Sequence, residues 1–396
     1  MSLSHLQPQS PDPLLSLIGD VRRDPRRGKI DLSVGVYRDE SGCTPVMAAV
    51  KQAERLLLEG QESKSYLGPE GDEAFVAHVA DLLLGTDNRS HVRGIQTPGG
   101  TAALRLAADL LALGDGSRRI WVGLPTWSNH LPILAAAGLD IRTFDAYDTV
   151  TQSLRVEATL AALNEARPGD AVLLQACCHN PTGMDPDAAT WTAITDILVQ
   201  RNLLPLLDIA YQGLGDGLDE DAWALRVIVE AVPEAIIAYS CNKNFGLYRD
   251  RVGALFVTGP SDAAVECAIG NAKTIARTSY SMPPDHGAAV VRLILGDQAL
   301  TAMWRDELNA MRARLLAIRQ ALADAGMAGT LDLTTVAQQK GMFSLLPLGR
   351  DLIDRLRMEH AIYMAPNGRV NLAGLPMAGV GQFVDALRAV ARHKAA

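Results

Sequence analysis

Short apolar runs alternate with amphipathic stretches along the middle of the chain, from about residue 95 to residue 260. Each run is bounded by Gly, Pro, Asn or Asp, which is typical of short buried strands. We therefore predict strands at 119–124, 139–144, 171–176, 203–210, 235–240 and 252–259.

The stretches between these runs carry apolar residues at helical spacing, and they predict helices at 100–113, 156–166, 187–201 and 221–232. Strand–helix alternation of this kind indicates an α/β fold, in which helices cover both faces of a mostly parallel sheet.

The two ends of the chain differ from this middle part. Residues 45–59 have helical spacing, with Pro45 suited to a first turn, and a long helical region is expected at 283–325. The C-terminal part mixes short strands and helices, which predicts a smaller α+β domain that the N-terminal segment joins. The expected division is 1–41 for the joining segment, 42–311 for the large domain and 312–396 for the small domain.

Composition excludes several classes of protein. The 396 residues carry a net charge of -8, so no basic face for nucleic acid is expected. No apolar run reaches the roughly 18–20 residues that span a bilayer, and the N-terminus does not resemble a secretory signal. Five cysteines without a CxxC pair argue against a disulfide framework and a structural zinc site. We expect a cytoplasmic enzyme without a bound metal.

Chemically useful residues follow the predicted strands. They are Trp127 and His130 after 119–124, Asn180 after 171–176, Asp208 and Tyr211 at the end of 203–210, and Lys243 after 235–240. Ligands bind beyond the carboxyl ends of the strands in open parallel sheets, so we expect these side chains to converge.

The run TPGGTAALR places Gly99, Gly100 and Thr101 at the start of a helix, where backbone N–H groups attract anions. A tight turn would explain the two glycines equally well. Taken singly, a strand-end aspartate is usually a turn former, and a lysine is usually a solvated surface charge. The combination of these residues indicates a functional site.

A series of motifs resembles the class I aminotransferases, in particular the aspartate and aromatic amino-acid subgroup. The motifs are GKIDLSVGVYRDESG, SYLGPEG, TPGGTAALR, PTWSNH, CCHNPTG, DIAYQG, NKNFGLYRDRVG, ARTSYSMPP and GRVNLAG. They cover nearly the whole chain in the order and with nearly the spacing of the family. The resemblance implies the type I pyridoxal-phosphate fold, with a mostly parallel seven-stranded sheet in the large domain, and a homodimer with shared active sites.

The resemblance also implies how pyridoxal 5'-phosphate is held. Lys243 would carry it as an internal aldimine and move protons, a task that needs an amine with a lowered pKa. Asp208 would pair with the ring nitrogen through a relay that includes His130. Tyr211 and Asn180 would bind the ring 3-oxygen. Trp127 would stack on the ring.

The phosphate group and the substrate have their own implied residues. Gly99, Gly100, Thr101, Ser240 and Arg251 would bind the phosphate, and Tyr66 would reach the phosphate of the neighbouring subunit, where it would also act as a catalytic residue. The substrate residues implied are Gly35, Trp127, Asn180, Arg369 for the α-carboxylate and Arg277 for a second carboxylate across the dimer interface.

Four positions depart from the pattern of the family. Asn242 replaces a serine before the lysine, and Gln175 replaces a histidine that supports the aspartate relay in many members. Met282 replaces a polar residue, and Ser65 replaces a larger one, both at the substrate end. The departures leave side-chain specificity open between dicarboxylic and aromatic amino acids.

Three functions fit these residues. The first is transamination of L-aspartate or aromatic L-amino acids with 2-oxoglutarate in a ping-pong sequence. The second is another reaction on the same fold: amino transfer to a different substrate, elimination or decarboxylation. The third, a cofactor-free binding protein, predicts loss of Lys243 or Asp208, and both are present. Arg277 and Arg369 favour the first.

Overall fold

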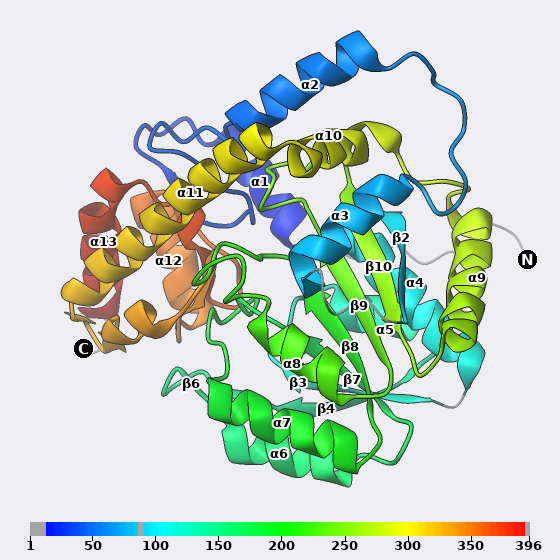
Figure 1. Ribbon diagram of the computed structural model, residues 1–396. Coiled ribbons are helices and arrows are strands. Elements are labelled where there is room, and N and C mark those ends of the chain that lie inside the picture. The colour runs from blue at the N-terminus through cyan, green and yellow to red at the C-terminus, as the bar shows by residue number, and fades with distance from the viewer. Residues whose placement is uncertain (1–12, 86–90, 117, 393–396) are drawn as a thin grey trace, which may run out of the picture.

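A seven-stranded sheet lies at the centre of the computed structural model, which describes residues 13–85, 91–116 and 118–392 (Figure 1). The strand order is β2-β10-β9-β8-β7-β3-β4, and only β10 runs antiparallel to its neighbours. The strands are β2 (Val92–Pro98), β3 (Arg119–Leu124), β4 (Asp140–Asp145), β7 (Ala171–Gln175), β8 (Leu204–Ile209), β9 (Ala235–Ser240) and β10 (Val252–Thr258). All six predicted strands are confirmed; β2 is the seventh.

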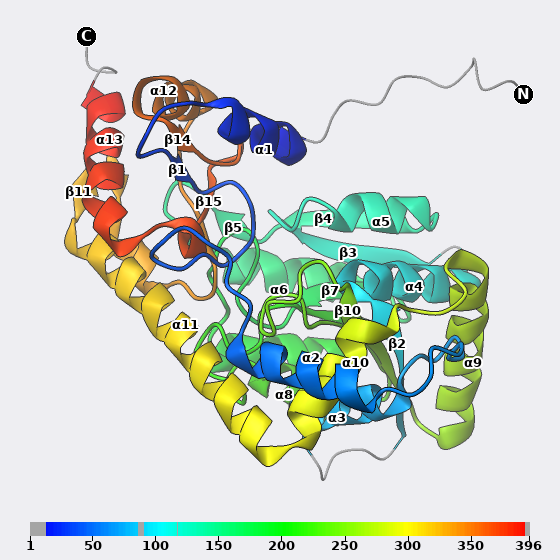
Figure 2. The same ribbon diagram turned by 90° about the horizontal axis from the view of Figure 1, so that it is seen from above.

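Helices cover both faces of the sheet (Figures 1 and 2). Successive strand residues point to opposite faces, so the apolar core of the sheet has two halves, with Ile236 in one and Ile237 in the other. Every residue of β9 and β10 is buried, as expected for strands covered on both sides. The helices around the sheet are α2 (Ala48–Gly60), α3 (Glu73–Leu84), α4 (Gly99–Gly114), α5 (His130–Ala136), α6 (Val156–Glu165), α7 (Ala188–Gln200), α8 (Trp223–Ala231), α9 (Asp262–Ser279) and α10 (Asp285–Gly296).

The predicted helical region at 283–325 is two helices. The first is α10, and the second is α11 (Gln298–Asp324). Asp297 between them has extended backbone dihedral angles, and its carboxylate accepts the N–H of Leu300 at 2.9 Å, which caps α11. The apolar spacing continues across the break, so periodicity alone does not reveal it.

Helix α2 begins at Ala48, three residues after Pro45. The first N–H groups of the helix are bound by a distant carboxylate, because Glu307 on α11 accepts from Ala48 at 2.7 Å and from Ala49 at 3.1 Å. A cap supplied from 259 residues away in the sequence has no local signal.

A second apolar core lies beside α11, on the side of the molecule that carries α12 and α13 (Figures 1 and 2). It combines Ile30 and Leu32 with residues between 318 and 390, and β1 pairs in parallel with β14. The elements of this part are α1 (Pro13–Arg23), β1 (Ile30–Asp31), β11 (Met327–Ala328), β12 (Leu331–Asp332), η2 (Thr334–Gln338), β13 (Phe343–Leu345), α12 (Arg350–His360), β14 (Ile362–Tyr363), β15 (Arg369–Asn371), η3 (Leu372–Gly374), η4 (Met377–Gly379) and α13 (Val380–Arg392).

This second core agrees with an N-terminal segment that joins the C-terminal part. The expected boundary at 311/312 falls inside α11, so the division remains a prediction. Residues 1–12 and 393–396 of the expected domains lie outside the described residues. A short hairpin, β5 (Tyr147–Asp148) with β6 (Ser153–Leu154), completes the elements of the large part.

Candidate active site

A cavity opens at the carboxyl ends of β7, β8 and β9, where the sequence predicted convergence. Most of the predicted cofactor residues line it, together with Gln175 and Asn242. The lining residues are Gly100, Thr101, Leu104, Trp127, Gln175, Asn180, Asp208, Ala210, Tyr211, Ser240, Asn242 and Lys243. The convergence is therefore confirmed for these residues.

Lys243 stands in a turn directly after β9, and its Nζ lies 5.0 Å from the centre of the Tyr211 ring. The pKa of the Lys243 amine is lowered to about 8, mainly by burial; Asp208 opposes the shift, and Arg251 contributes to it. An amine with this pKa is partly deprotonated near neutral pH, so it can act as a nucleophile or as a proton carrier.

Asp208, at the end of β8, is almost completely buried and is part of a hydrogen-bonded chain. Its Oδ2 lies 3.0 Å from Nε2 of His130, which is itself buried at the start of α5. Nδ1 of His130 lies 2.7 Å from Oγ1 of Thr126. These hydrogen bonds fix the direction of the Asp208 carboxylate, and Asp208 lines the cavity.

Tyr211 and Asn180 form a polar pair on the other side of the cavity. The side-chain amide of Asn180 donates to the hydroxyl oxygen of Tyr211 at 3.2 Å. Burial raises the pKa of Tyr211 well above its usual value, so the hydroxyl stays neutral and can donate a hydrogen bond. Trp127 is half-buried and meets the ring of His130 edge-on, at 5.2 Å between centroids.

The first turn of α4 forms a close-fitting cradle with β9 and the residues after it. A β-carbon at Gly99, where φ is +77°, would lie 2.7 Å from Nη2 of Arg251, and one at Gly100 would lie 2.9 Å from Cβ of Ser240. Glycine therefore allows the guanidinium and the hydroxyl to approach the helix N-terminus. Backbone N–H groups, a hydroxyl and a cation together suit a phosphate.

Asn242 has a structural role at this cradle. Its Oδ1 accepts the N–H of Val252 at 3.3 Å, and its own N–H points to Oγ of Ser240 at 3.4 Å. The side chain thus connects the end of β9 to the start of β10.

Arg369 on β15 is buried beside Asn180, which lines the cavity. Its guanidinium donates to Oδ1 of Asn180 at 3.3 Å and to the backbone oxygen of Ser33 at 3.0 Å, and it lies 4.5 Å from the centre of the Phe343 ring. A β-carbon at Gly35 would lie 2.9 Å from Phe343. The predicted substrate residues Arg369 and Gly35 are therefore close to the same aromatic ring.

Tyr66 and Arg277 are not brought into the cavity of this chain. Tyr66 is 94% exposed in the segment between α2 and α3, and Arg277 is exposed at the end of α9, where it donates to Oγ of Ser281. The two segments are neighbours, because Lys273 Nζ lies 3.7 Å from Glu70 Oε2. Both residues thus lie on one exposed part of the molecule.

Two residues of the site were missed in the sequence. Thr126 contacts His130 from four positions earlier in the same PTWSNH run, so its spacing was a usable signal. Phe343 reaches Arg369 through the antiparallel pair β13–β15 and meets the Tyr211 ring edge-on at 5.8 Å. No local pattern around Phe343 indicates these contacts.

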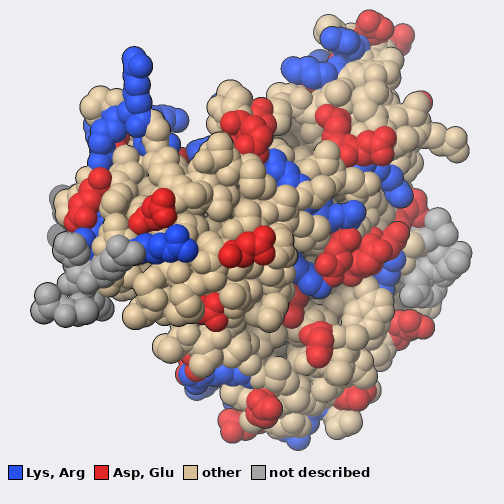
Figure 3. Space-filling model, turned by 90° about the vertical axis from the view of Figure 1, so that its left-hand side faces the viewer, with Lys and Arg blue, Asp and Glu red and all other residues tan. Residues whose placement is uncertain are grey.

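Other expectations bear on metals and membranes. All five cysteines are free thiols: Cys177, Cys178 and Cys241 are buried, and Cys43 and Cys267 are exposed. In the described part of the chain, Cys177, Cys178 and Asp221 have ligand atoms within 4.8 Å of one another, but Asp221 already accepts three backbone N–H groups. Within the described ranges, no helix has the length and apolar character to cross a membrane. On the face in Figure 3, basic and acidic side chains are interspersed.

Comparison with known proteins agrees with this geometry. The model of the family "Aminotransferase class I and II" matches residues 27–387. The chain is 54% identical over 371 residues to a tyrosine aminotransferase of Rhizobium meliloti (93% of this chain, 95% of the relative). It is 44% identical over 387 residues to an aromatic-amino-acid aminotransferase of Pseudomonas aeruginosa (96% of each). An aspartate aminotransferase of Escherichia coli is 42% identical over 385 residues (96% and 97%).

Solved structures give the same result. An aromatic amino-acid aminotransferase from Burkholderia pseudomallei, described as covalently bound to pyridoxal phosphate, has a TM-score of 0.94 at 37% identity, covering 98% of this chain and all of its own. The chain therefore belongs to the class I and II aminotransferases, and the predicted fold class is confirmed.

Proposed function

We propose that the chain transfers the amino group of L-aspartate or an aromatic L-amino acid to 2-oxoglutarate, with pyridoxal 5'-phosphate as cofactor. The observation that carries the proposal is Lys243, an amine of lowered pKa in one cavity with Asp208. Relatives named tyrosine, aromatic-amino-acid and aspartate aminotransferase support it. Because a single cofactor would carry the amino group, the two half-reactions would take place one after the other in the same cavity, in ping-pong order.

The bound cofactor supplies an electron sink for the bond that breaks at the substrate Cα. Lys243 would hold it covalently, and its amine, once released, would take and return the Cα proton. Asp208, oriented by His130, would keep the ring nitrogen protonated. Tyr211 and Asn180 would bind the ring 3-oxygen from the opposite side.

The remaining cofactor residues would hold the ring face and the phosphate. Trp127 would cover the ring. The phosphate would be bound by Gly99, Gly100, Thr101, Ser240 and Arg251, and by Tyr66 of a second subunit. The close approach of Arg251 and Ser240 to the two glycines supports this assignment.

Substrate binding would use two arginines. Arg369, beside Asn180, would bind the α-carboxylate through its planar guanidinium, with Gly35 leaving room at the same ring of Phe343. Arg277 would bind a second carboxylate from across a homodimer interface. Exposure of Arg277 and Tyr66 on neighbouring segments supports a dimer with shared sites.

We also propose that residues 1–41 and 312–396 form one small domain, that 42–311 form the large domain, and that the enzyme works in the cytoplasm. The shared apolar core of Ile30, Leu32 and residues 318–390 supports the first division. Five free thiols fit a reducing compartment.

A donor screen tests this function. We expect purified protein to absorb visible light, to change that absorbance when an amino acid is added, and to form a new amino acid from 2-oxoglutarate. Aspartate, phenylalanine and tyrosine should all serve as donors, because Met282 and Ser65 make the substrate end softer and less crowded. Release of ammonia or carbon dioxide in place of a 2-oxo acid would indicate a lyase or a decarboxylase.

Substrate range is tested separately by Arg277→Leu. The variant should lose about 2–5 kcal/mol of preference for aspartate, the cost of unpairing a desolvated charge, and keep its activity on phenylalanine. The measurement is kcat/KM for both donors. Equal losses would show that Arg277 does not bind the second carboxylate.

A further inference from the structure

Gln175, the last residue of β7, lies between two polar groups of the cavity and forms hydrogen bonds with both. One group is the Thr126–His130–Asp208 series, and the other is the pair of Asn180 and Tyr211. We propose that Gln175 is a positioning residue that keeps Nδ1 of His130 unprotonated, acting through Thr126. The proposal deepens the proposed function, and it depends on that function only for the role of Asp208.

The orientation of the Gln175 amide follows from the backbone of Asn180. The N–H of Asn180 donates to Oε1 of Gln175 at 3.0 Å, and Nε2 of Gln175 donates to the backbone oxygen of Asn180 at 3.0 Å. A backbone N–H can only donate and a backbone carbonyl can only accept, so the amide cannot be reversed without losing both bonds.

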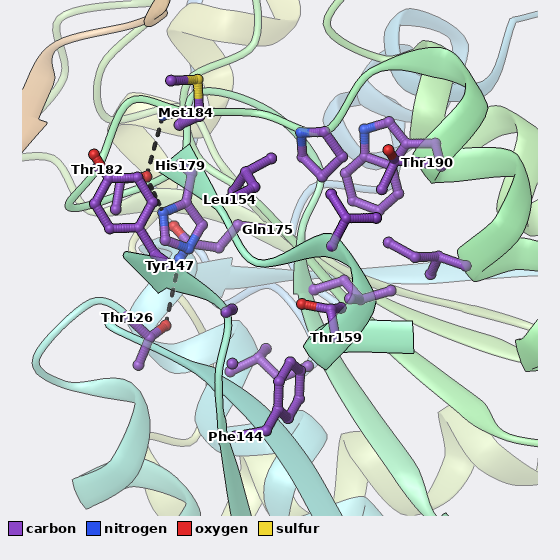
Figure 4. A pocket seen from close by; sticks show the side chains of 18 residues that line it. Thr126, Phe144, Tyr147, Leu154, Thr159, Gln175, His179, Thr182, Met184 and Thr190 are labelled. Atoms are coloured by element: carbon purple, nitrogen blue, oxygen red, sulfur yellow. Dashed lines mark hydrogen bonds between the residues drawn. The ribbon is translucent and has the colours of Figure 1, made fainter. Parts of the chain in front are cut away.

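The second hydrogen of Nε2 then points to Thr126. Nε2 lies 3.3 Å from Thr126 Oγ1, and Figure 4 shows Gln175 and Thr126 joined by this bond. Because an amide nitrogen is only a donor, the hydroxyl oxygen of Thr126 accepts here. Its single hydrogen is therefore available to another acceptor.

That acceptor is Nδ1 of His130, 2.7 Å from Thr126 Oγ1. The Asp208 carboxylate can only accept, so Nε2 of His130 carries a proton, and in a neutral imidazole Nδ1 is then the acceptor of the Thr126 hydrogen. Nε2 faces Asp208 Oδ2 at 3.0 Å and donates to it. The order of donors is thus Gln175, Thr126, His130 and Asp208, each one passing a hydrogen to the next.

The surroundings strengthen this order. Gln175 also borders a second, largely apolar cavity, whose lining includes Phe144 and Leu154 (Figure 4). An apolar surrounding offers few competing partners, and hydrogen bonds are stronger where the local dielectric is low. An amide has no titratable proton, so its donor direction does not change with pH.

Gln175 also connects this series of hydrogen bonds to the residues assigned to substrate binding. The same amide holds the backbone of Asn180, whose side chain contacts both Tyr211 and Arg369. Gln175 therefore holds both Asn180, which is assigned to the ring 3-oxygen, and the series of hydrogen bonds that ends at Asp208.

The test is the protonation state of His130 in full-length protein labelled with ¹⁵N-histidine. Protonated and unprotonated ring nitrogens give well-separated NMR signals, and the His130 signals are those lost in a His130→Asn variant. In wild type we expect a protonated Nε2 and an unprotonated Nδ1. A protonated Nδ1 in wild type would overturn the proposal without any change at Gln175.

Gln175→Glu replaces the donor by an acceptor of the same shape. The new carboxylate should take the hydroxyl hydrogen of Thr126, so His130 Nδ1 should become protonated and donate to Thr126. We expect kcat/KM to fall at least about 10-fold, as when other orienting hydrogen bonds are removed. The matched control is Gln200→Glu, the same change at an exposed position of α7, which should alter neither quantity.

A double variant separates the relay from a simple charge effect. In Gln175→Glu with Thr126→Val, the hydroxyl is absent, so His130 should return to an unprotonated Nδ1. A protonated Nδ1 in the double variant would show that the charge acts directly and would overturn the role of Thr126. These NMR results do not depend on turnover, so lack of transamination in wild type would refute the proposed function and leave this inference standing.

Discussion

The amine of Lys243 gives the site its chemical character. It lies beside the face of the Tyr211 ring, and its burial lowers its pKa to about 8. An exposed lysine is almost fully protonated at neutral pH, whereas this one has a substantial unprotonated fraction. The same burial that costs free energy while the amine is charged therefore prepares it for covalent attachment and proton transfer.

Replacement of this amine should remove both roles. Lys243→Ala should lose about 4–8 kcal/mol of transition-state stabilisation while the protein remains folded. The measurement is kcat/KM, with Lys51→Ala on the exposed surface of α2 as the control. Borohydride reduction of wild type followed by peptide mapping should mark Lys243. A label on Lys51, Lys273 or Lys340 would contradict the assignment.

The pKa of Lys243 predicts the pH dependence of its reactivity after the cofactor is removed. The unprotonated fraction rises with pH, so aldehyde labelling of Lys243 in the cofactor-free protein should accelerate with a midpoint at about pH 8. Arg251 lowers this pKa and Asp208 raises it. The midpoint should therefore move up in Arg251→Met and down in Asp208→Asn. Shifts in the opposite directions would refute this electrostatic account.

The same shift makes Lys243 contribute to stability in a defined pH range. Its pKa is about 8 in the folded chain and 10.5 when unperturbed. Between these values the unfolded chain binds more protons than the folded chain, so the contribution of Lys243 to the free energy of unfolding rises with pH. Below about pH 8 both states are protonated, and the unfavourable burial of the charge is fully present.

At the scale of elements, α11 connects the sheet to the second apolar core. Near its end, Arg319 is buried and donates to backbone oxygens of Val336, Lys340, Gly341 and Phe343. Burial lowers the pKa of Arg319 to about 10, which leaves it charged at neutral pH. The guanidinium thus holds the segment that carries Phe343, the ring under Arg369.

Loss of this arginine should destabilise the segment. Arg319→Ala leaves several buried carbonyl oxygens without a donor, and we expect the free energy of unfolding to fall by about 3–5 kcal/mol. Urea unfolding of the holoenzyme measures it. Arg305→Ala, on an exposed position of the same helix, should change stability by less than about 0.5 kcal/mol. If Arg319→Ala changed the free energy of unfolding by an equally small amount, water would have replaced the hydrogen bonds of the guanidinium.

Elements with an uninterrupted apolar pattern were predictable from the sequence. β9 and β10 are buried along their whole length, so their pattern is continuous. β2 was not predicted, because Arg93, Gly94 and Pro98 interrupt it and only its second half is buried. The break at Asp297 and the cap that Glu307 gives to α2 depend on tertiary contacts.

The residues of the candidate site also divide into those that were predictable from the sequence and those that were not. Asp208, Lys243 and Asn180 were predictable, because strand ends place them and their motifs are distinctive. Phe343 was not identified, because its contact with Arg369 forms only once the small sheets have packed, whereas Thr126 was overlooked although it lies four residues before His130 in one motif. The order of hydrogen bonds at Gln175 needs atomic positions as well, since one residue type can donate or accept.

At the scale of the whole molecule, the cavity described here lacks two of the residues that the family motifs assign to the site. Tyr66 and Arg277 face away from it on neighbouring exposed segments. The side chain of Tyr66 is 94% exposed, so a second copy of the chain could reach it. Two copies that exchange these segments would complete each other's cavities.

Mixing two inactive variants tests this arrangement. A dimer of two Arg277→Ala subunits keeps Lys243 in both cavities but has no Arg277 to complete them. A dimer of two Lys243→Ala subunits keeps Arg277 but has no Lys243 in either cavity. A hybrid dimer contains one cavity with Lys243 from the first subunit and Arg277 from the second, and one cavity with neither. Partial unfolding or prolonged incubation of the mixture should therefore restore aspartate transamination, up to about one quarter of the wild-type rate per subunit for random pairing in a two-fold dimer.

The control mixes Arg277→Ala with Tyr66→Ala. Both changes act on the partner's cavity, so each hybrid cavity keeps one defect and no full site forms. If subunit exchange is demonstrated by mass and the first mixture stays inactive, each cavity is built from a single chain, and Arg277 has no role across the interface.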